Sequence, residues 1–172
     1  AVRTGAALVN DVSMIGDPQM INVISDTDIP IVISHIRKKG HQGEVVNEVI
    51  DDLRGAVNDL RKARVVKSKI IVDPGIGFAK NADESIALLR NIHRLRTELE
   101  LPVMIGTSRK SFIGSVTDEL VKDRRFGTAA TVAWSVTCEV DIVRVHDVSE
   151  MVKVVKMSDI LARHFKNGAS RA

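Results

Sequence analysis

The stretch PVMIGTSRKSFIG, residues 102–114, joins a short apolar strand directly to a group of cations and hydroxyls. Val103, Met104 and Ile105 form a run that is typical of a strand buried in a parallel sheet. After Gly106, the polar residues 107–111 follow without a break. Because ligands of parallel α/β proteins bind at the carboxyl ends of the strands, this stretch predicts both a parallel sheet and a binding site at its edge.

The same alternation recurs along the chain, where short runs rich in Val and Ile are followed by longer amphipathic stretches. The expected strands are Ala7–Asn10, Pro30–His35, Lys69–Asp73, Pro102–Gly106 and Asp141–His146. The expected helices are Asp17–Ser25, Glu44–Ala63, Asp83–Leu99, Arg125–Thr137 and Ser149–His164, with a surface loop at Ser115–Arg124. Repeated strand–helix units predict a parallel α/β sheet with right-handed crossovers.

Two architectures fit these units: an open doubly wound sheet of five strands, or part of a (β/α)₈ (TIM) barrel. A whole barrel needs about 250 residues, or roughly 30 per unit, so this chain of 172 residues has room for five units. The pattern of units alone leaves both architectures open.

The composition narrows the classes of partner. The net charge is +3 and the bases are spread along the chain, which does not favour nucleic acid. No apolar run approaches the ~20 residues of a membrane span. The single cysteine, Cys138, excludes an internal disulfide and is expected to be a small buried filler. Trp134 is expected to pack in the core.

Polar residues follow each expected strand. They are Asn10 and Asp11; Ser34, His35 and Arg37; Asp73 with Gly75 and Gly77; Ser108 to Ser111; and Arg144 with His146. Because the carboxyl ends of parallel strands meet at one edge, we expect these five groups to converge on one site. His35 has no second His or Cys at ligand spacing, so we expect a hydrogen-bonding role and no metal.

Asp73 ends a very apolar strand, where a carboxylate without hydrogen-bond donors would be costly. A heterocycle with two parallel N–H groups would supply such donors. The other interpretation is that Asp73 caps the next helix or pairs with a neighbouring base. Gly75 and Gly77 predict a turn or a close approach of ligand, and Phe78 a wall beside it.

Arg144 and His146 lie two residues apart in DIVRVHDV (141–148), so they share one face of the expected strand. Two donors side by side suit a phosphate or pyrophosphate. The alternative is an ion pair of Arg144 with an acidic neighbour, Asp147 or Asp141, and a histidine with a purely structural hydrogen bond.

Five segments together resemble, in order, the last five β–α units of the dihydropteroate synthase family. They are ALVNDVS (7–13), IVDPGIGFAKN (71–81), IGTSRKSFIG (105–114), RRFGTAATVAW (124–134) and DIVRVHDVSEM (141–151). The resemblance runs from about Gly5 to Leu161. It implies the barrel architecture, with residues 1–172 forming one pterin-binding domain that lacks its N-terminal strands. We therefore expect a partial barrel with little or no activity alone.

The resemblance also implies the reaction. Enzymes of this family condense 7,8-dihydropterin pyrophosphate with p-aminobenzoate, giving 7,8-dihydropteroate and pyrophosphate in folate biosynthesis. Mg²⁺ accompanies the pyrophosphate, and sulfonamides target the family. Because an open partial barrel exposes two sheet edges, we expect either a homo-oligomer, a dimer, that covers them or a further N-terminal portion. The resemblance implies a cytoplasmic enzyme, or a mitochondrial one in a eukaryote, with no nucleic-acid or membrane partner.

Site roles carry over onto the matching positions. The pterin would be bound by Asn10, Asp73, Gly106 and Lys110. The p-aminobenzoate would be bound by Phe78, Ser108 and Ser111. The pyrophosphate would be bound by Arg144, His146 and Arg109, the last as a stacking or supporting cation. Lys110, Arg144 and His146 are the expected catalytic residues, and no residue is expected to ligate a metal.

Three other functions remain open at this point. A corrinoid methyltransferase-like domain would also hold a pterin with Asn and Asp, but it has no pyrophosphate to anchor. A non-catalytic pterin-binding segment would bind pterin without making product. A doubly wound sheet could instead bind an unrelated phosphate.

Overall fold

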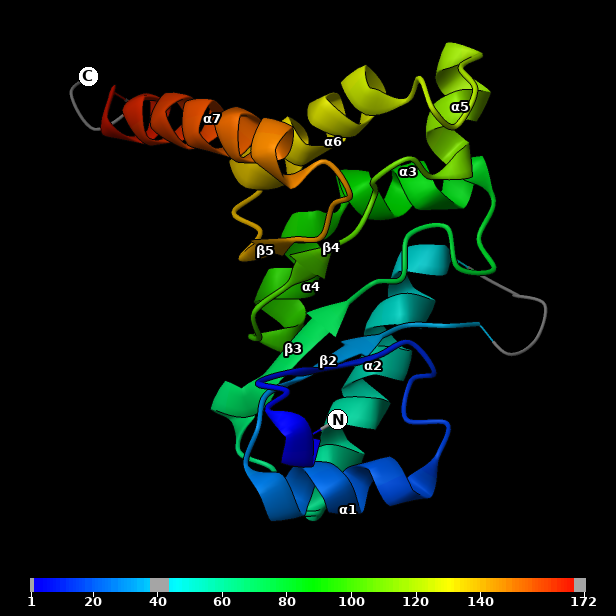
Figure 1. The fold of residues 1–172 in the computed structure, drawn as a ribbon, viewed down its shortest axis with the longest axis vertical. Helices are drawn as coiled ribbons and strands as arrows, with labels where there is room; N and C mark the ends of the chain where they lie inside the picture. Colours follow the sequence, from blue (N-terminus) through cyan, green and yellow to red (C-terminus); the bar gives the residue numbers. More distant parts are fainter. Residues whose placement is uncertain (1, 38–43, 169–172) are drawn as a thin grey trace.

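Five parallel strands form the centre of the computed structural model, which describes residues 2–37 and 44–168 (Figure 1). The strands are β1 (Val9–Asp11), β2 (Ile31–Ser34), β3 (Ile70–Asp73), β4 (Met104–Ile105) and β5 (Ile142–Val143). β1, β2 and β3 pair in that order, β4 pairs with β5, and a parallel bridge from Val72 to Val103 joins the two groups. The spatial order therefore follows the chain order without a reversal, as in a barrel and unlike a doubly wound sheet.

Helices connect the strands. They are α1 (Pro18–Thr27), α2 (Val45–Lys62), α3 (Ala82–Arg90), α4 (Ile92–Leu99), α5 (Ser111–Thr117), α6 (Arg125–Thr137) and α7 (Val148–Gly168), with short 3₁₀ turns η1 (Val2–Thr4) and η2 (Lys67–Lys69). α5, α6 and α7 lie at one end of the molecule and α1 at the other (Figure 1). α6 packs against α7, and α3 against α5. No helix within the described ranges is both long and apolar enough to cross a membrane.

The core lies between the sheet and the helices that cover it. Ile31 and Ile33 of β2 are fully buried and meet the apolar seam of α2. That seam, which recurs at helical spacing, consists of Val45, Val46, Val49, Ile50, Leu53, Val57 and Leu60. β2 and β3 lie in the middle of the described strands, and their carboxyl ends carry Ser34 and Asp73 side by side in register.

The expected helix 83–99 is two helices that are separated at Asn91. The Asn91 amide donates to the carbonyls of both Ala87 and Leu88, and its side-chain nitrogen donates to Ala87 as well. These bonds end α3 before α4 begins. The helix prediction was wrong there because both helices bury their apolar residues on one side, so the spacing runs through the break.

Three smaller expectations also differ from the structure. The strand expected at Asp141–His146 is β5, Ile142–Val143 only, so Arg144 and His146 lie on the loop that follows it. The expected loop 115–124 begins inside α5, which ends where Asp118 adopts a left-handed conformation (φ 56°). Trp134 is not a core residue: it is 48% exposed, and its indole nitrogen donates to the carbonyl of Leu89. An amphipathic ring of this kind can cover a helix surface while its N–H finds a backbone partner.

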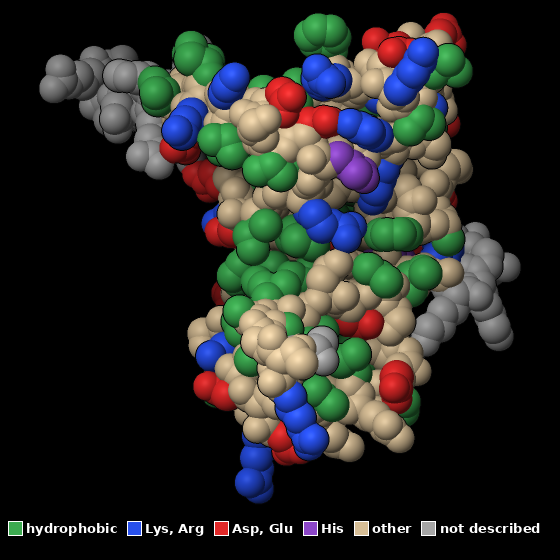
Figure 2. Space-filling model, viewed as in Figure 1, with side chains coloured by type: hydrophobic (Ala, Val, Ile, Leu, Met, Phe, Trp, Pro, Cys, Tyr) green, Lys and Arg blue, Asp and Glu red, His purple; other side chains and the backbone are tan. Residues whose placement is uncertain are grey.

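Within the described residues, β1 and β5 each pair on one side only. Leu8 and Val12 flank β1 and are exposed, as is Ile142 in β5. Figure 2 shows hydrophobic side chains gathered at mid-height on one face, in the region where Figure 1 draws β4 and β5. The sheet is therefore an open arc with an apolar surface near its edges.

Candidate functional site

A polar pocket of about 230 Å³ lies at the carboxyl ends of β4 and β5. Its lining residues are Gly106, Ser108, Lys110, Arg144, Val145 and His146. Figure 2 shows a histidine bordered by Lys and Arg side chains on the viewed face. The structure thus brings together the groups that follow two separate strands, as the sequence pattern predicts.

Arg144 is held at the pocket by both its backbone and its neighbour. Its amide donates to the Ile105 carbonyl at 2.9 Å, which extends the pairing of β4 with β5. Its guanidinium lies so close to Gly106 that a Cβ there would be 3.3 Å from Nε and Nη2. Residue 106 must therefore be small for the guanidinium to lie across the strand end.

His146 is fixed by Ser108. The Ser108 hydroxyl accepts the His146 amide at 3.2 Å, and it lies 2.9 Å from the ring nitrogen Nδ1. If the hydroxyl proton donates to Nδ1, the other ring nitrogen carries the proton and can donate to an anion. Ser108, expected at the benzoate, therefore lies beside the histidine expected at the pyrophosphate.

Asp73 is a buried carboxyl, 1% exposed. Its Oδ1 accepts the Gly75 amide at 2.8 Å, and its Oδ2 accepts the Ser34 hydroxyl at 3.1 Å. Burial raises the pKa of Asp73, against the opposing effects of these hydrogen bonds and of the Lys110 and Arg144 cations. Asp73 is thus neither a helix cap nor a member of a direct ion pair among the described contacts, and it lies close to two cations of the pocket.

Lys110 joins the pocket to the turn that follows β3. Its Nζ donates to the Ile76 carbonyl and lies 4.5 Å from the centroid of the Phe78 ring. Burial, against the opposing Asp73 charge, lowers the pKa of Lys110 to about 8. The expected wall, Phe78, is therefore in cation–π contact with the expected catalytic lysine.

The remaining expected residues lie around this centre. The guanidinium of Arg109 pairs with Asp147 and does not line the pocket. Ser111 opens α5 and is exposed. Asn10 is exposed on β1 and is not among the lining residues. The roles of all three residues stay predictions.

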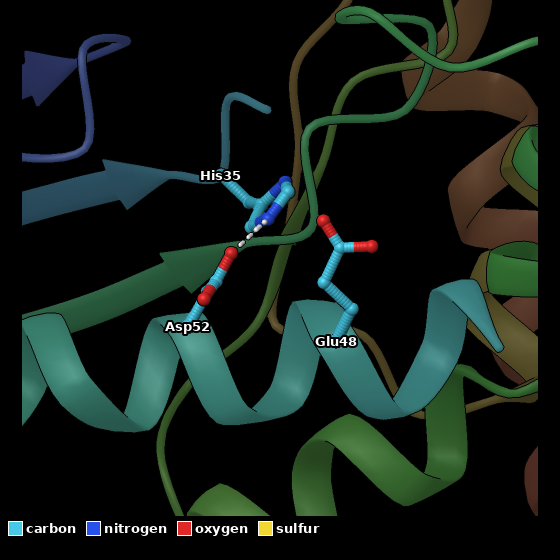
Figure 3. A group of neighbouring side chains, drawn as sticks. All are labelled: His35, Glu48 and Asp52. Atoms are coloured by element: carbon cyan, nitrogen blue, oxygen red, sulfur yellow. Dashed lines mark hydrogen bonds and ion pairs between the residues drawn. The ribbon is translucent and has the colours of Figure 1, made fainter. Parts of the chain in front are cut away.

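A separate cluster of possible metal ligands surrounds His35. Figure 3 shows His35 after β2 facing Glu48 and Asp52 on α2, and ligand atoms of the three lie within 4.8 Å of one another. However, Arg37 pairs with Glu48 at 3.2 Å, and Lys80 Nζ lies 2.9 Å from His35 Nδ1. Arg37 and Lys80 thus already bond to members of the cluster, so it is a network of ion pairs and hydrogen bonds. This agrees with the hydrogen-bonding role expected for His35.

Sequence reasoning missed several residues that support the site. Lys80 is buried beside His35, and Asp147 holds Arg109. Thr128 and Thr131 of α6 bind the stretch after β4: the Thr128 hydroxyl accepts the Arg109 amide, and Thr131 pairs with Thr107. The one hint for Lys80 was a lysine directly after a glycine-rich turn, which alone does not distinguish a buried from an exposed side chain.

Comparison with protein families gives a match over residues 1–146 to the family model described as "Pterin binding enzyme". The dihydropteroate synthase of Bacillus subtilis is 37% identical, with 94% of this chain and 56% of the relative covered. The dihydropteroate synthase of Synechocystis is 38% identical, with 95% of this chain and 59% of the relative covered. The folic acid synthesis protein fol1 of Pneumocystis carinii is 38% identical, with 94% of this chain and 24% of the relative covered. The chain thus spans little more than half the length of the bacterial relatives.

Solved structures of dihydropteroate synthases have the same fold. The Clostridium difficile enzyme, solved in the presence of pteroic acid, matches with a TM-score of 0.89 at 34% identity, covering 93% of this chain and 61% of that one. The Xanthomonas albilineans enzyme in complex with 7,8-dihydropteroate matches with a TM-score of 0.88 at 32% identity, covering 93% and 61%. These enzymes are TIM barrels, which confirms the prediction that the five units are part of a (β/α)₈ barrel.

Proposed function

This chain belongs to the pterin-binding enzyme family, and we propose that it forms the substrate-binding part of a dihydropteroate synthase. The observation that carries the proposal is the pocket that places Arg144, His146 and Lys110 together, with Asp73 buried nearby. The likeness to dihydropteroate synthases across 92–95% of the chain supports the same reaction class.

The substrates would be 7,8-dihydropterin pyrophosphate and p-aminobenzoate. The C–O bond between the pterin methylene and the pyrophosphate breaks, a C–N bond to the arylamine forms, and the amine then loses a proton. Arg144 and His146 would stabilise the negative charge that develops on the leaving pyrophosphate. The arylamine is weakly basic and needs little deprotonation before attack, so no catalytic dyad is required and catalysis rests on positioning.

Asp73 would bind the amino-pyrimidine edge of the pterin, which offers two parallel N–H donors. The raised pKa of Asp73 supports this, because a buried carboxylate gains most from a ligand that supplies donors. Lys110, between the Phe78 ring and the pocket, would contact the pterin. Ser111 would bind the carboxylate of p-aminobenzoate, and sulfonamides would compete for the same place.

Magnesium remains a prediction from the family resemblance. Of the residues that the structure describes, those lining the pocket offer two cations, an imidazole and a hydroxyl, and no carboxylate among them. This donor set fits a pyrophosphate and does not fit a divalent metal, whose preferred ligands are oxygens with negative or partial negative charge. No step of the proposed reaction is therefore assigned to the ion.

We also propose that three further β/α units, in the same polypeptide or a separate one, complete the barrel. Support comes from the open sheet edges at β1 and β5 and from the coverage of about 60% of the Clostridium difficile enzyme. The chain alone is expected to have little or no synthase activity. A turnover with p-aminobenzoate equal to that of a closed-barrel synthase would contradict this.

Since further β/α units would cover the sheet edges, we propose that the dimer forms instead through the helices at one end of the molecule. Phe126 and Trp134 of α6 and Met157, Ile160 and Leu161 of α7 are large apolar residues that are exposed. Large exposed apolar side chains on two helices that pack against each other are candidates for an interaction surface. Sedimentation of the wild type and of Phe126→Asp tests the proposal: the wild type should be a dimer and the variant more dissociated. A monomeric wild type would contradict it.

Titration calorimetry with inorganic pyrophosphate tests the proposed synthase site. Wild type should bind, Arg144→Ala should lose at least about tenfold in affinity because a charged hydrogen-bond donor is removed, and Arg61→Ala, an exposed arginine of α2, should bind like wild type. A corrinoid methyltransferase-like domain has no need of this anion. Equal affinity of Arg144→Ala and wild type would overturn the proposal.

A further inference from the structure

We propose that Lys80, together with His35, is a positioning residue that sets the shape of the turn between Asp73 and Phe78 and thereby the pterin side of the site. This inference rests on the proposed function. Lys80 does not line the polar pocket, and its side chain lies behind the turn. The argument depends on how its ammonium group is bound.

The Lys80 ammonium has an acceptor for each of its three protons. Nζ lies 2.9 Å from His35 Nδ1, 3.1 Å from the Gly75 carbonyl oxygen and 3.2 Å from that of Phe78. The residue is only 8% exposed, so these contacts replace water. A buried cation that is completely bound by one turn and one side chain is a strong constraint on both.

His35 must accept a hydrogen bond from Lys80, and this determines its tautomer. With Nδ1 as the acceptor, the proton is on Nε2, which donates to Asp52 Oδ2 at 3.1 Å (Figure 3). Burial and the neighbouring Lys80 lower the pKa of His35 to about 4, so the ring is neutral near pH 7. The chain of contacts runs from Asp52 on α2 through His35 to Lys80 and then to the turn.

The turn needs these side-chain contacts because its backbone conformation is unusual. Gly75 and Gly77 have φ values of +66° and +76°, and Ala79 has +48° although it carries a Cβ. A Cβ on Gly75 would overlap the backbone carbonyl of His35, so the turn lies directly against the end of β2. A left-handed alanine costs free energy, which the contacts of the adjacent lysine offset.

Two lysines hold this turn from two sides. Lys80 binds the carbonyls of Gly75 and Phe78, and Lys110 donates to the carbonyl of Ile76 between them. The amide of Gly75 meets the Asp73 carboxyl, and the Phe78 ring lies against Lys110. Loss of Lys80 would therefore displace the groups expected at the pterin and the benzoate. Arg144 and His146, on the loop after β5, would keep their places.

Binding measurements with Lys80→Met separate this role from a purely structural one. Methionine has a similar length and no donor. We expect affinity for 6-hydroxymethylpterin-monophosphate to fall about tenfold or more, as when a buried polar group loses its partner, and affinity for inorganic pyrophosphate to change by less than about twofold. Lys67→Met, at an exposed ion pair, is the matched control and should leave both unchanged.

Four results would overturn the inference or its premise. Unchanged pterin affinity in Lys80→Met, or an equal loss for both ligands, overturns the positioning role. A wild type that binds pyrophosphate but no pterin phosphate overturns the proposed function instead. If Lys80→Met does not fold, two His35 variants test the role instead. His35→Asn keeps an acceptor near the place of Nδ1 and should retain the affinity for the pterin phosphate. His35→Leu has no acceptor there and should lose that affinity. Equal affinities of these two variants would again contradict the role.

Discussion

The guanidinium of Arg109 donates two hydrogen bonds to the carboxylate of Asp147, at 3.2 and 2.6 Å. The pair joins the loop after β4 to the residue that follows His146, so it ties together the two strand ends that form the pocket. The pairing raises the pKa of Arg109 and lowers the pKa of Asp147, which keeps both groups charged. Arg109 thus supports the neighbours of the pocket from outside it.

Substitution of Arg109 distinguishes a supporting role from direct binding of the anion. Because a partly exposed ion pair is weak, Arg109→Ala should lower pyrophosphate affinity by roughly two- to fivefold, far less than Arg144→Ala. Asp147→Ala should have a similar effect, and the double variant should be no weaker than the single variants. The measurement is titration calorimetry with pyrophosphate. A loss in Arg109→Ala as large as that in Arg144→Ala would show that Arg109 binds the anion itself.

Gly106 controls the place of the Arg144 guanidinium. A Cβ at residue 106 would lie 3.3 Å from two guanidinium nitrogens, so Gly106→Ala should push the side chain aside by a few tenths of an ångström. We expect a loss of pyrophosphate affinity of roughly threefold to tenfold, because charge-assisted hydrogen bonds depend on geometry.

Gly55 provides the control for that substitution. It lies inside α2, and a Cβ there would meet nothing within 4 Å. Gly55→Ala should therefore raise the free energy of unfolding by about 0.5–1 kcal/mol and leave binding unchanged. A Gly106→Ala protein that binds pyrophosphate as tightly as Gly55→Ala would contradict the steric argument.

The strands and the convergence of polar groups could be predicted because each depends on local pattern and parallel topology. Residues 31–33 are an unbroken apolar run, which predicts a buried strand because both faces of a parallel sheet are covered. Strand alternation was the basis for expecting Arg144 and His146 on one face, but β5 ends at Val143 and both residues lie on the loop after it, where they still meet at one pocket. Parallel strands then bring them to the same edge as Lys110, whatever the loops between them do.

The parts that could not be predicted depend on tertiary contacts. Nothing in the spacing of Leu88, Ile92 and Leu95 shows that Asn91 ends a helix, because the buried face continues past it. Burial of Lys80 depends on carbonyl groups that converge only when the turn before it takes left-handed conformations. Exposure of Trp134 depends on what covers α6, and a helix of mostly small and apolar residues does not reveal that.

Close packing of α5 on α6 at Gly127 gives a stability prediction with a built-in rescue. A Cβ at residue 127 would overlap Cγ2 of Ile113, which is buried. Gly127→Ala should lower the free energy of unfolding by about 1–3 kcal/mol through overpacking. Ile113→Leu removes the branch at Cβ and should cost less than about 1.5 kcal/mol alone.

The double variant tests whether this one contact causes the loss. Gly127→Ala combined with Ile113→Leu should be more stable than the sum of the two single effects predicts, because the overlapping methyl group is absent. Denaturant unfolding at a fixed pH measures all four proteins. Strict additivity would mean that the strain lies elsewhere in α6.

The buried His35 predicts how stability responds to acid. Burial, followed by the charge of Lys80, lowers the pKa of His35 in the folded protein to about 4 from the ordinary value of 6.5. Between these values the unfolded chain binds the proton and the folded protein does not. The free energy of unfolding therefore falls as the pH drops from 6.5 to 4, by about 3 kcal/mol from this residue.

Replacement of the titrating ring isolates this contribution. His35→Asn does not titrate in this range, so its stability should fall less than that of wild type between pH 7 and pH 4, by roughly the same 3 kcal/mol. Urea unfolding at several pH values gives the two curves. Parallel curves for the two proteins would mean that the His35 ring accepts a proton in the folded state, which is incompatible with a Lys80 ammonium donating to Nδ1.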